Sequence, residues 1–393
     1  MDGYMSAIAD VEPYLLYGGG EDPAPWSSAV LLVKVVTKDG RTGWGETLTS
    51  IRAGAVAYMV KVLAKVMKGR DVHNVESNRA LWYKLDFNHA ISLESVAALS
   101  AFDMASWDII GRELGAPLHM FFGGLTRDRV PVYANGWYGG CRDPACFAEK
   151  AKDVVKKGYT ALKFDPFGDS FDHIDESSLR RATEIVRAVR EAVGDDVDIL
   201  IECHGRFNAE SAVRIAQALK PYRVYFFEEP VHPEDIEGLA KFKAAVDAPV
   251  ALGERIINKG QLLQYIRYAD YLQIDLGRFG GPTEARKAAA MAEAYGVLMA
   301  FHNANGPVLH AATIQLDAAI PNFALQESFY DFWPQWKRDL IGGSMPVEGG
   351  YVSVPRRPGI GVDVNEKVVE RYKAEPGEVE IRGEPHWVVK GTW

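Results

Sequence analysis

Apolar residues beyond position 130 recur in short runs of strand type, and each run is followed by a longer stretch of helical type. The runs are VPVYANGW (130–137), TALKFDPF (160–167), VDILIECH (197–204), RVYFFEEP (223–230), PVALGER (249–255), YLQIDLG (271–277), VLMAFHN (297–303) and FALQESF (323–329). The stretches between them, such as SLRRATEIVRAVREAVG (178–194), have the apolar spacing of amphipathic helices. Eight such units predict parallel strands with helical crossovers, an α/β barrel of the (β/α)7β TIM type in which the last unit is irregular.

The first third of the chain has a different pattern. Residues 28–47 form two apolar runs joined at Asp39-Gly40, a dipeptide that supports a tight hairpin turn. Helical stretches are expected at 53–68, 75–86 and 92–114. The pattern predicts an α+β capping domain over residues 1–125, a catalytic barrel over 126–345, and a C-terminal segment, 346–393, that packs back on the capping domain.

Composition narrows the class of protein. The chain has 393 residues, of which 48% are hydrophobic and 25% charged, as in globular proteins with a large core. A formal net charge of −9 argues against nucleic acid or an anionic membrane as a main partner. Because the sequence shows neither an export signal nor an apolar run of about 20 residues, we expect a soluble, cytoplasmic protein. Cys141, Cys146 and Cys203 are expected to be reduced thiols, with a zinc role for the first two as a less favoured alternative.

Each predicted barrel strand ends in polar side chains. In this fold the C-terminal strand ends converge on one mouth, where catalytic residues lie. Glu202, Glu228 and Glu254 are spaced 26 residues apart, one in each successive unit. Three converging carboxylates would repel one another, so a hard dication such as Mg²⁺ is their natural partner, whereas zinc would favour His or Cys. Solvent-facing glutamates are the plainer alternative, but all three follow apolar strands.

The stretch LIECHGRFN (200–208) places a histidine two residues after the first of these carboxylates. In a strand, alternate side chains share a face, so Glu202 and His204 are expected to point the same way while Cys203 points to the other side. The two side chains would then belong to one site. A purely structural histidine is the alternative.

Several motifs resemble the enolase superfamily, and within it the mandelate racemase subgroup. They are GWGE (43–46), FDMASWDIIGRELGAPLHMFFGG (102–124), EEP (228–230) and GE (253–254), and the resemblance covers the whole chain. It implies that Glu202, Glu228 and Glu254 bind Mg²⁺. It also implies that Asp275 and His302 form a dyad, with His302 as the base that removes a proton α to a carboxylate, and that Glu327 hydrogen-bonds the substrate carboxylate.

The chain departs from the racemases of this family on the second barrel strand. Racemases carry Lys-Xaa-Lys there, and the second lysine is a base on the opposite face, whereas this chain reads Lys163-Phe164-Asp165. A one-base reaction is therefore favoured. His204 can then protonate a departing hydroxyl, which indicates dehydration, and the acid-sugar dehydratases of the family carry a histidine at this place. His302 itself is the alternative acid.

Other runs resemble the gluconate dehydratases. They are KFDPFG, HGRFN, EEPVHPED, FYDFWPQWKRDL and the terminal WVVKGTW. The resemblance implies dehydration of D-gluconate to 2-keto-3-deoxy-D-gluconate by a symmetric homo-oligomer. Galactonate and xylonate remain alternatives because they share the configuration at carbons 2 and 3. A racemase, a cycloisomerase and a non-catalytic barrel are the other hypotheses.

Further residues are expected around the substrate. Lys163 is expected to pair with the substrate carboxylate, while Asp165 and Arg206 either bind distal hydroxyls or form a local ion pair. The resemblance assigns the segment 16–22 and the loop 48–54 to a lid that sets specificity, and their glycines suit a mobile cover.

Overall fold

An antiparallel sheet and helices packed on it form the first unit of the fold. The computed structural model describes residues 6–19, 29–47, 52–85 and 91–379. Within these residues the sheet has the order β1 (Ile8–Tyr17), β2 (Ala29–Thr37), β3 (Thr42–Thr47), and the helices are α1 (Ala53–Met67), α2 (Val75–Leu85) and α3 (Leu93–Glu113). The predicted hairpin and the three helices are confirmed. The prediction missed β1, where Asp10, Glu12 and Pro13 interrupt the apolar pattern although the strand pairs with β2 along its length.

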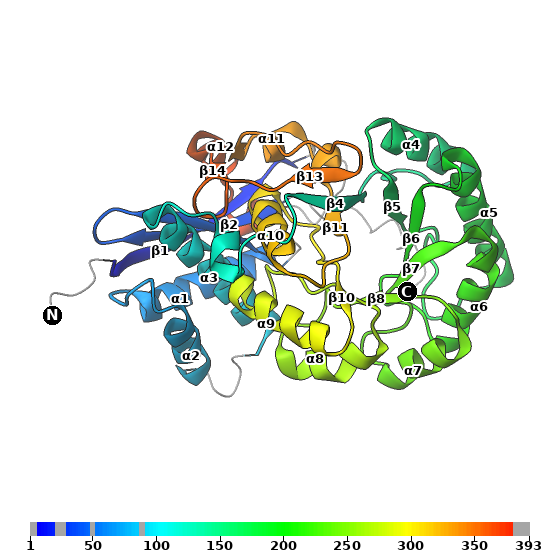
Figure 1. Ribbon diagram of the computed structural model, residues 1–393, viewed down its shortest axis with the longest axis horizontal. Coiled ribbons are helices and arrows are strands. Elements are labelled where there is room, and N and C mark those ends of the chain that lie inside the picture. Colours follow the sequence, from blue (N-terminus) through cyan, green and yellow to red (C-terminus); the bar gives the residue numbers. More distant parts are fainter. Residues whose placement is uncertain (1–5, 20–28, 48–51, 86–90, 380–393) are drawn as a thin grey trace.

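The second unit is the predicted barrel (Figure 1). Its parallel strands within the described part of the chain are β4 (Arg129–Ala134), β5 (Ala161–Phe164), β6 (Asp198–Glu202), β7 (Val224–Glu228), β8 (Val250–Leu252), β9 (Tyr271–Leu272), β10 (Leu298–Met299) and β11 (Gln326–Ser328). They are hydrogen-bonded in the order β10-β9-β8-β7-β6-β5-β4-β11. The two ends of this order meet where Met299 and Phe323 form a parallel bridge. The predicted TIM-type fold is confirmed: seven of the eight strands lie within the predicted runs, and β4 begins one residue before its run.

Helices cover the outside of the barrel. They are α4 (Pro144–Lys156), α5 (Glu176–Val193), α6 (Ala209–Leu219), α7 (Ile236–Ala245), α8 (Lys259–Tyr265), α9 (Gly281–Ala294) and α10 (Pro307–Ala319). Short 3₁₀ turns lie at η3 (Leu118–Phe122), η4 (Lys220–Tyr222), η5 (Ile266–Tyr268), η6 (Tyr330–Phe332) and η7 (Pro376–Glu378). Several helices begin at an Asp or Asn whose side chain accepts hydrogen bonds from first-turn N–H groups, as at Asp143 and Asp175.

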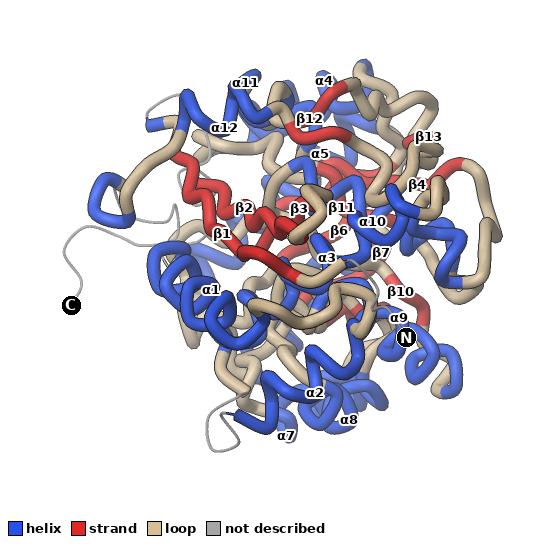
Figure 2. The backbone as a smooth tube through the Cα atoms, turned by 90° about the vertical axis from the view of Figure 1, so that its left-hand side faces the viewer, coloured by secondary structure: helices blue, strands red, loops and turns tan. Residues whose placement is uncertain are grey.

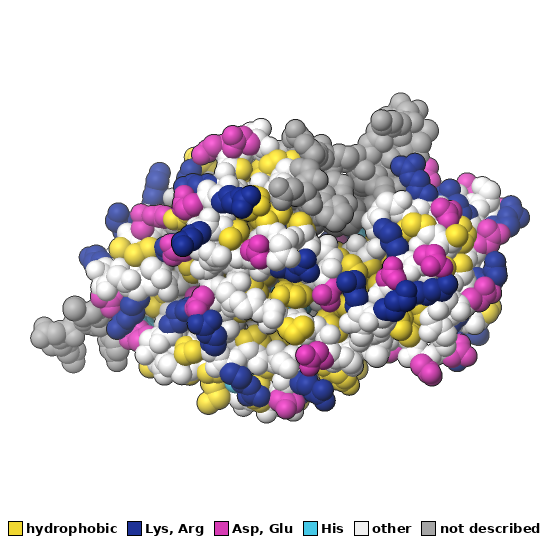
Figure 3. Space-filling view, turned by 90° about the horizontal axis from the view of Figure 1, so that it is seen from above, with side chains coloured by type: hydrophobic (Ala, Val, Ile, Leu, Met, Phe, Trp, Pro, Cys, Tyr) yellow, Lys and Arg dark blue, Asp and Glu magenta, His cyan; other side chains and the backbone are white. Residues whose placement is uncertain are grey.

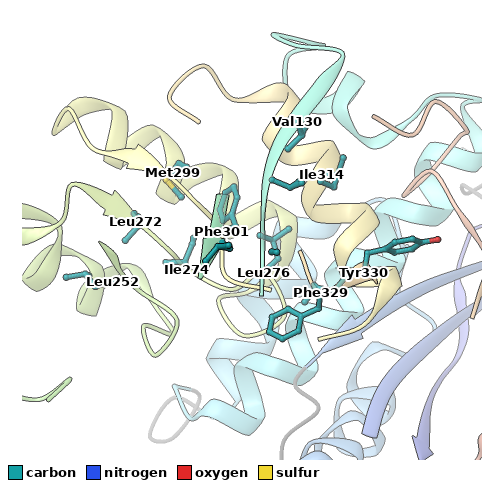
Figure 4. Packing of buried hydrophobic residues seen from close by; sticks show 14 of the residues in the cluster. Val130, Leu252, Leu272, Ile274, Leu276, Met299, Phe301, Ile314, Phe329 and Tyr330 are labelled. Carbon is teal, nitrogen blue, oxygen red and sulfur yellow. The ribbon is translucent and has the colours of Figure 1, made fainter. Parts of the chain in front are cut away.

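Side chains of the barrel strands alternate between an inner and an outer layer. The inner apolar layer, which we call the barrel floor, consists of Tyr133, Ala161, Leu200, Phe226, Ala251, Ala300 and Leu325. Outer side chains such as Leu272, Met299 and Phe301 belong to a larger cluster, which also contains Ile314 of α10 (Figure 4). Because the strand period is two, a residue two positions beyond the floor also points inward, at the C-terminal mouth.

The segment after the barrel contacts both units. It contains α11 (Gln335–Arg338), β12 (Ile341–Gly342), β13 (Tyr351–Ser353), β14 (Asp363–Val364) and α12 (Glu366–Tyr372). Strand β13 pairs with β4, whereas the chain beyond α12 joins the first sheet, where the Ala374 N–H donates to the Leu15 carbonyl at 2.8 Å. The Lys34 ammonium of β2 lies 2.8 Å from the Glu366 carboxylate. Figure 2 shows α12 above β1 and β2, on the side opposite α1.

Two buried carboxylates of the first unit sit at the beginnings of barrel helices. Glu46 accepts hydrogen bonds from the backbone N–H groups of Val308 (3.0 Å) and Leu309 (2.9 Å) in α10. Asp103 accepts from the Thr283 N–H (3.0 Å) and hydroxyl (2.7 Å) in α9. Burial raises the pKa of each carboxyl to about 7, and the helix N-termini favour the ionised forms. The first unit is therefore anchored beside the loops that follow β9 and β10.

A disulfide joins Cys141, in the loop after β4, to Cys146, in the first turn of α4, so the expected reduced thiols are wrong for this pair. The turn brings their Cα atoms to 5.4 Å, within the range that a disulfide requires. Both sulfurs are thereby used, which also removes the zinc alternative. Cys203 is a buried free thiol, as expected.

We predict that the double replacement Cys141→Ser and Cys146→Ser lowers the free energy of unfolding by up to about 2 kcal/mol, because the bond closes a short loop in the unfolded chain. Thermal melts with and without a phosphine reductant measure the effect. The reductant is expected to lower the melting temperature of the unaltered protein and to leave the double variant unchanged. Equal melting curves for the unaltered protein in both conditions would contradict the assignment.

Helix length and surface charge are the features by which a protein would engage a membrane or a nucleic acid. Among the described residues, no helix combines the length and apolar character needed to cross a bilayer. On the face shown in Figure 3, basic and acidic side chains are interspersed and do not gather in a patch of one sign.

Candidate active site

A layer of polar side chains lies directly above the barrel floor, at the C-terminal mouth. Its members each follow a floor residue by two positions, and they are Asn135, Lys163, Glu202, Glu228, His302 and Glu327. All of them are buried. Strand alternation therefore brings residues that are far apart in the sequence into one inward-facing ring.

Lys163 occupies the centre of this ring. Its ammonium lies 2.9 Å from Glu202 Oε2, 2.5 Å from Glu228 Oε2 and 2.9 Å from Glu327 Oε1. Burial by itself would lower the pKa of Lys163, but the carboxylates outweigh burial and raise the pKa well above its usual value. The three carboxylates therefore favour the charged form of Lys163 at the mouth.

Glu228 shows that the ring is short of positive charge. Burial and the neighbouring Glu202 carboxylate raise the pKa of Glu228 well above its usual range. Its Oε2 accepts from Gln273 Nε2 at 2.7 Å, whereas its buried Oε1 has no hydrogen-bond partner among the described residues. A buried carboxylate oxygen without a donor is costly, and an added cation would satisfy it.

Glu254 is the third expected metal ligand. It lies two residues beyond the end of β8, where Oε1 contacts Arg255 at 2.8 Å and Oε2 contacts His302 Nε2 at 2.8 Å. Burial opposes ionisation of Glu254, but the His302 imidazolium lowers its pKa to about 2. Among the described residues, no three acidic, His or Cys side chains are already arranged around one point as metal ligands.

The donor set nevertheless fits a hard dication. Glu202, Glu228 and Glu254 offer only oxygen atoms from successive strands, and the Glu228 Oε1 oxygen lacks a partner among the described residues. Lys163 and His302 are the cations that these carboxylates contact instead.

Asp275 and His302 are brought together from neighbouring strands. His302 Nδ1 lies 2.8 Å from Asp275 Oδ2, and this carboxylate also accepts from the Gly277 N–H (2.7 Å) and Asn305 Nδ2 (2.9 Å). Burial would lower the pKa of His302, but the surrounding carboxylates, with Glu254 the strongest, raise it to about 10. Asp275 thus fixes the ring with Nε2 toward the mouth.

Glu327 is held by hydrogen bonds to both of its carboxylate oxygens. Its Oε1 accepts from Asn135 Nδ2 at 2.7 Å, and its Oε2 accepts from the Asn303 N–H at 2.7 Å. His302 Nε2 is 3.8 Å from Oε2. Burial opposes ionisation, but Lys163 and His302 outweigh it and lower the pKa of Glu327.

His204 reaches the mouth by a different route from the one predicted. Strand β6 ends at Glu202, and His204 lies in a turn with φ 52°, so strand alternation does not place it. Instead, the His204 backbone N–H donates to Glu202 Oε1 at 2.7 Å, and the ring Nδ1 lies 2.7 Å from Asp165 Oδ2. His204 does lie next to Glu202, as expected. The expected reason, a shared face of one strand, was wrong. Cys203 points into the outer cluster, as expected.

Asp165 and Arg206 adopt the ion-pair alternative. Arg206 Nη2 donates to both oxygens of Asp165, at 2.8 and 2.7 Å. Asp165 Oδ1 also accepts from the Phe167 N–H at 2.9 Å. These contacts already use both oxygens of Asp165, so the arrangement does not present the pair to distal hydroxyls.

Sequence reasoning missed several polar residues of the mouth. Gln273, Asn135 and Asn305 donate to Glu228, Glu327 and Asp275, and Arg278 contacts Asp275 at 3.2 Å. Strand alternation was an available signal for two of them, because Asn135 follows a floor residue by two positions and Gln273 precedes Asp275 by two. Of the expected lid, residues 20–22 and 48–51 lie outside the described residues.

Two family models cover most of the chain. The model for the enolase C-terminal domain-like family matches residues 146–368, and the model for the mandelate racemase and muconate lactonizing enzyme N-terminal domain matches residues 26–123. The chain belongs to the enolase superfamily. The resemblance expected from the motifs is thereby confirmed. Members of this superfamily depend on a metal ion.

Relatives of this enolase superfamily chain extend over its whole length. A D-gluconate dehydratase of Thermoproteus tenax is 54% identical, over 100% of this chain and 79% of the relative. A D-gluconate/D-galactonate dehydratase of Picrophilus torridus is 43% identical, over 99% of this chain and 100% of the relative. The structure of a mandelate racemase/muconate lactonizing enzyme-like protein from Roseovarius sp. TM1035 superposes with a TM-score of 0.87 at 34% identity, covering 94% of this chain and 96% of that one.

Proposed function

We propose that this protein is a Mg²⁺-dependent dehydratase that converts D-gluconate to 2-keto-3-deoxy-D-gluconate. The observation that carries the proposal is the pairing of two differently placed histidines with one carboxylate cluster. His302, held by Asp275, faces Glu254, and His204, held by Asp165, lies beside Glu202. One base and one acid are the groups that an elimination of water requires. The names of the Thermoproteus and Picrophilus relatives support the same reaction.

In the proposed reaction, one group of residues binds the metal and the substrate, and a second group transfers protons. Bound Mg²⁺, held by Glu202, Glu228 and Glu254, would supply the positive charge that makes a proton α to a carboxylate removable. The Lys163 ammonium binds the substrate carboxylate. Glu327 donates a hydrogen bond to it in the protonated form, which the negative charge of the adjacent substrate carboxylate favours. Both side chains are buried and fixed, so they orient the sugar acid without reorganising.

Proton transfer then uses the two histidines. A cation held by Glu254 would offset the negative charge that most raises the pKa of His302, so the ring would be neutral and Nε2 could remove the proton from carbon 2. Asp275 then stabilises the imidazolium that forms. His204 gives a proton to the hydroxyl on carbon 3, the bond from carbon 3 to that oxygen breaks, and water leaves. The resulting enol tautomerises to the 2-keto product. Because Lys163 is committed to three carboxylates, β5 offers no base for exchange from the opposite face.

A screen of sugar acids with Mg²⁺ tests the proposal. Gluconate, galactonate and xylonate are incubated with the protein, and the 2-keto-3-deoxy product is measured. We expect gluconate to react fastest. Galactonate is the second candidate, because the Picrophilus relative is named for both acids. Deuterium entering carbon 2 without loss of water would instead indicate a racemase and overturn the dehydratase proposal.

Replacing His204 with Asn tests the acid. The variant is expected to lose about 10²–10⁴-fold in kcat on gluconate, because a positioned acid contributes that much. Mg²⁺ binding should persist, since Glu202 remains. A gluconate analogue with fluoride in place of the 3-hydroxyl needs little protonation of its leaving group, so the variant should regain most of its rate there. Equal losses on both substrates would assign the acid to another group, with His302 the first alternative.

We also propose, from the sequence and the family, that the protein works as a homo-oligomer in the cytoplasm. Size-exclusion chromatography with light scattering tests the assembly, and a monomer at micromolar concentration would contradict it.

A further inference from the structure

Asp165, His204 and Arg206 form a closed network at the edge of the mouth. Asp165 Oδ2 lies 2.7 Å from His204 Nδ1, and both Asp165 oxygens accept from Arg206 Nη2. Arg206 also donates to the Gly168 carbonyl at 3.0 Å and to the Cys203 carbonyl at 3.3 Å. The network therefore connects the loop after β5 with the turn after β6.

The Asp165 carboxylate is saturated by these contacts. Oδ1 accepts from Arg206 and from the Phe167 N–H, and Oδ2 accepts from Arg206 while facing His204. Its side chain is 0% exposed, and that of Arg206 is 4% exposed. These contacts occupy both groups within the network. His204 differs, because its side chain is 23% exposed and its Nε2 is the ring nitrogen turned away from Asp165.

The turn that carries His204 is held in an unusual conformation. His204 has φ 52°, a region that non-glycine residues seldom adopt without support from their surroundings. Its N–H donates to Glu202 Oε1 at 2.7 Å, and its carbonyl accepts from Arg255 Nη2 at 3.0 Å. These backbone contacts fix the position of the residue but leave the rotation of its ring undetermined.

We infer that Asp165 and Arg206 are positioning residues that fix the orientation and tautomer of the His204 ring for proton delivery to the leaving hydroxyl. Asp165 performs for His204 the role that Asp275 performs for His302, with a closely similar contact of 2.7 Å against 2.8 Å. Arg206 donates Nη2 to both oxygens of Asp165, while Nη1 and Nε hold the guanidinium on the Gly168 and Cys203 carbonyls. The single ammonium of a lysine could not make all of these contacts in the same geometry. This inference rests on the proposed dehydratase function.

The test compares Asp165→Asn with His204→Asn on two substrates in the presence of Mg²⁺. Asp165→Asn is expected to lower kcat on gluconate by about 10²-fold with KM changed less than about threefold, because the ring loses its orientation while the substrate contacts remain. On the 3-fluoro analogue the loss should largely disappear. The double variant is expected to be no slower on gluconate than His204→Asn, because Asp165 acts only through His204.

A matched control is available in the same loop. Asp172 also contacts a histidine, with Oδ1 2.6 Å from His232 Nε2, but its side chain is 67% exposed. Asp172→Asn is expected to leave kcat, KM and the ratio of the two substrates unchanged. Arg206→Lys, which retains the charge, provides a second variant measured in the same way if Asp165→Asn does not fold.

The outcomes separate the inference from the proposed function. If the unaltered protein dehydrates none of the sugar acids, the proposed function fails. If it dehydrates gluconate and His204→Asn shows fluoride rescue, additive losses in the double variant would overturn the positioning role alone. Equal losses of Asp165→Asn on both substrates would likewise overturn it and assign Asp165 to the structure of the mouth. Rescue together with non-additivity supports it.

Discussion

Replacing His302 with Asn will abolish both the loss of water from gluconate and the exchange of the carbon 2 proton with solvent. We expect a loss of at least about 10³-fold, within the range for a positioned general base. The reason is that Lys163, the cation on β5, is bound to three carboxylates and cannot serve as a second base. Proton NMR in deuterium oxide with Mg²⁺ measures both processes in one experiment.

The control for this variant is His232→Asn, which removes a histidine that pairs with the exposed side chain of Asp172. It should retain normal exchange and dehydration. Exchange that survives in the His302 variant at an appreciable rate would reveal a base on the opposite face of the substrate. The one-base mechanism would then be replaced by a racemase-like mechanism with two bases.

Replacing Glu228 with Gln will remove Mg²⁺ affinity and activity together. The amide keeps the shape of the side chain but removes one charge from the ligand set, so we expect Mg²⁺ binding to weaken by more than about 100-fold, beyond the effect of losing an outer-shell partner. Titration calorimetry with Mg²⁺, alongside the dehydration assay, measures both losses.

The metal-free variant should melt no lower than the metal-free unaltered protein. Burial and Glu202 already raise the pKa of Glu228, so a neutral side chain relieves repulsion rather than creating it. A variant that binds no Mg²⁺ while keeping its melting temperature therefore separates metal loss from misfolding. Full activity of the unaltered protein in excess chelator would disprove the metal assignment.

The placement of the mouth residues shows where sequence reasoning succeeds and where it fails. Glu202, Glu228 and Glu327 could be placed because each sits in a strand of period two, where direction follows from counting. His302 lies three residues beyond β10, but its bridge with Asp275 continues the same alternation. His204 could not be placed in this way, because its left-handed backbone takes it out of the strand period. His204 lies next to Glu202 because its backbone N–H donates to the Glu202 carboxylate within a turn.

Contacts that depend on tertiary structure could not be predicted from the sequence either. The pairing of Asp165 with Arg206 joins residues 41 positions apart, and either one could equally have faced a ligand. The disulfide depends on how a turn brings Cys141 and Cys146 together, whereas the sequence offered only an odd number of cysteines. Strand β1 is held by its partner β2, although its own apolar pattern is weak.

The two-residue step from the barrel floor to the polar ring suggests how such a scaffold can acquire new reactions. A substitution at Asn135, Lys163 or Gln273 alters the chemistry offered to a ligand and leaves every floor side chain in place. An inserted residue in any of these strands would instead turn its mouth residue toward the helices and misplace the apolar side chains beneath it. Point replacement, and not a change of strand length, is therefore the route by which directed evolution could retool this barrel.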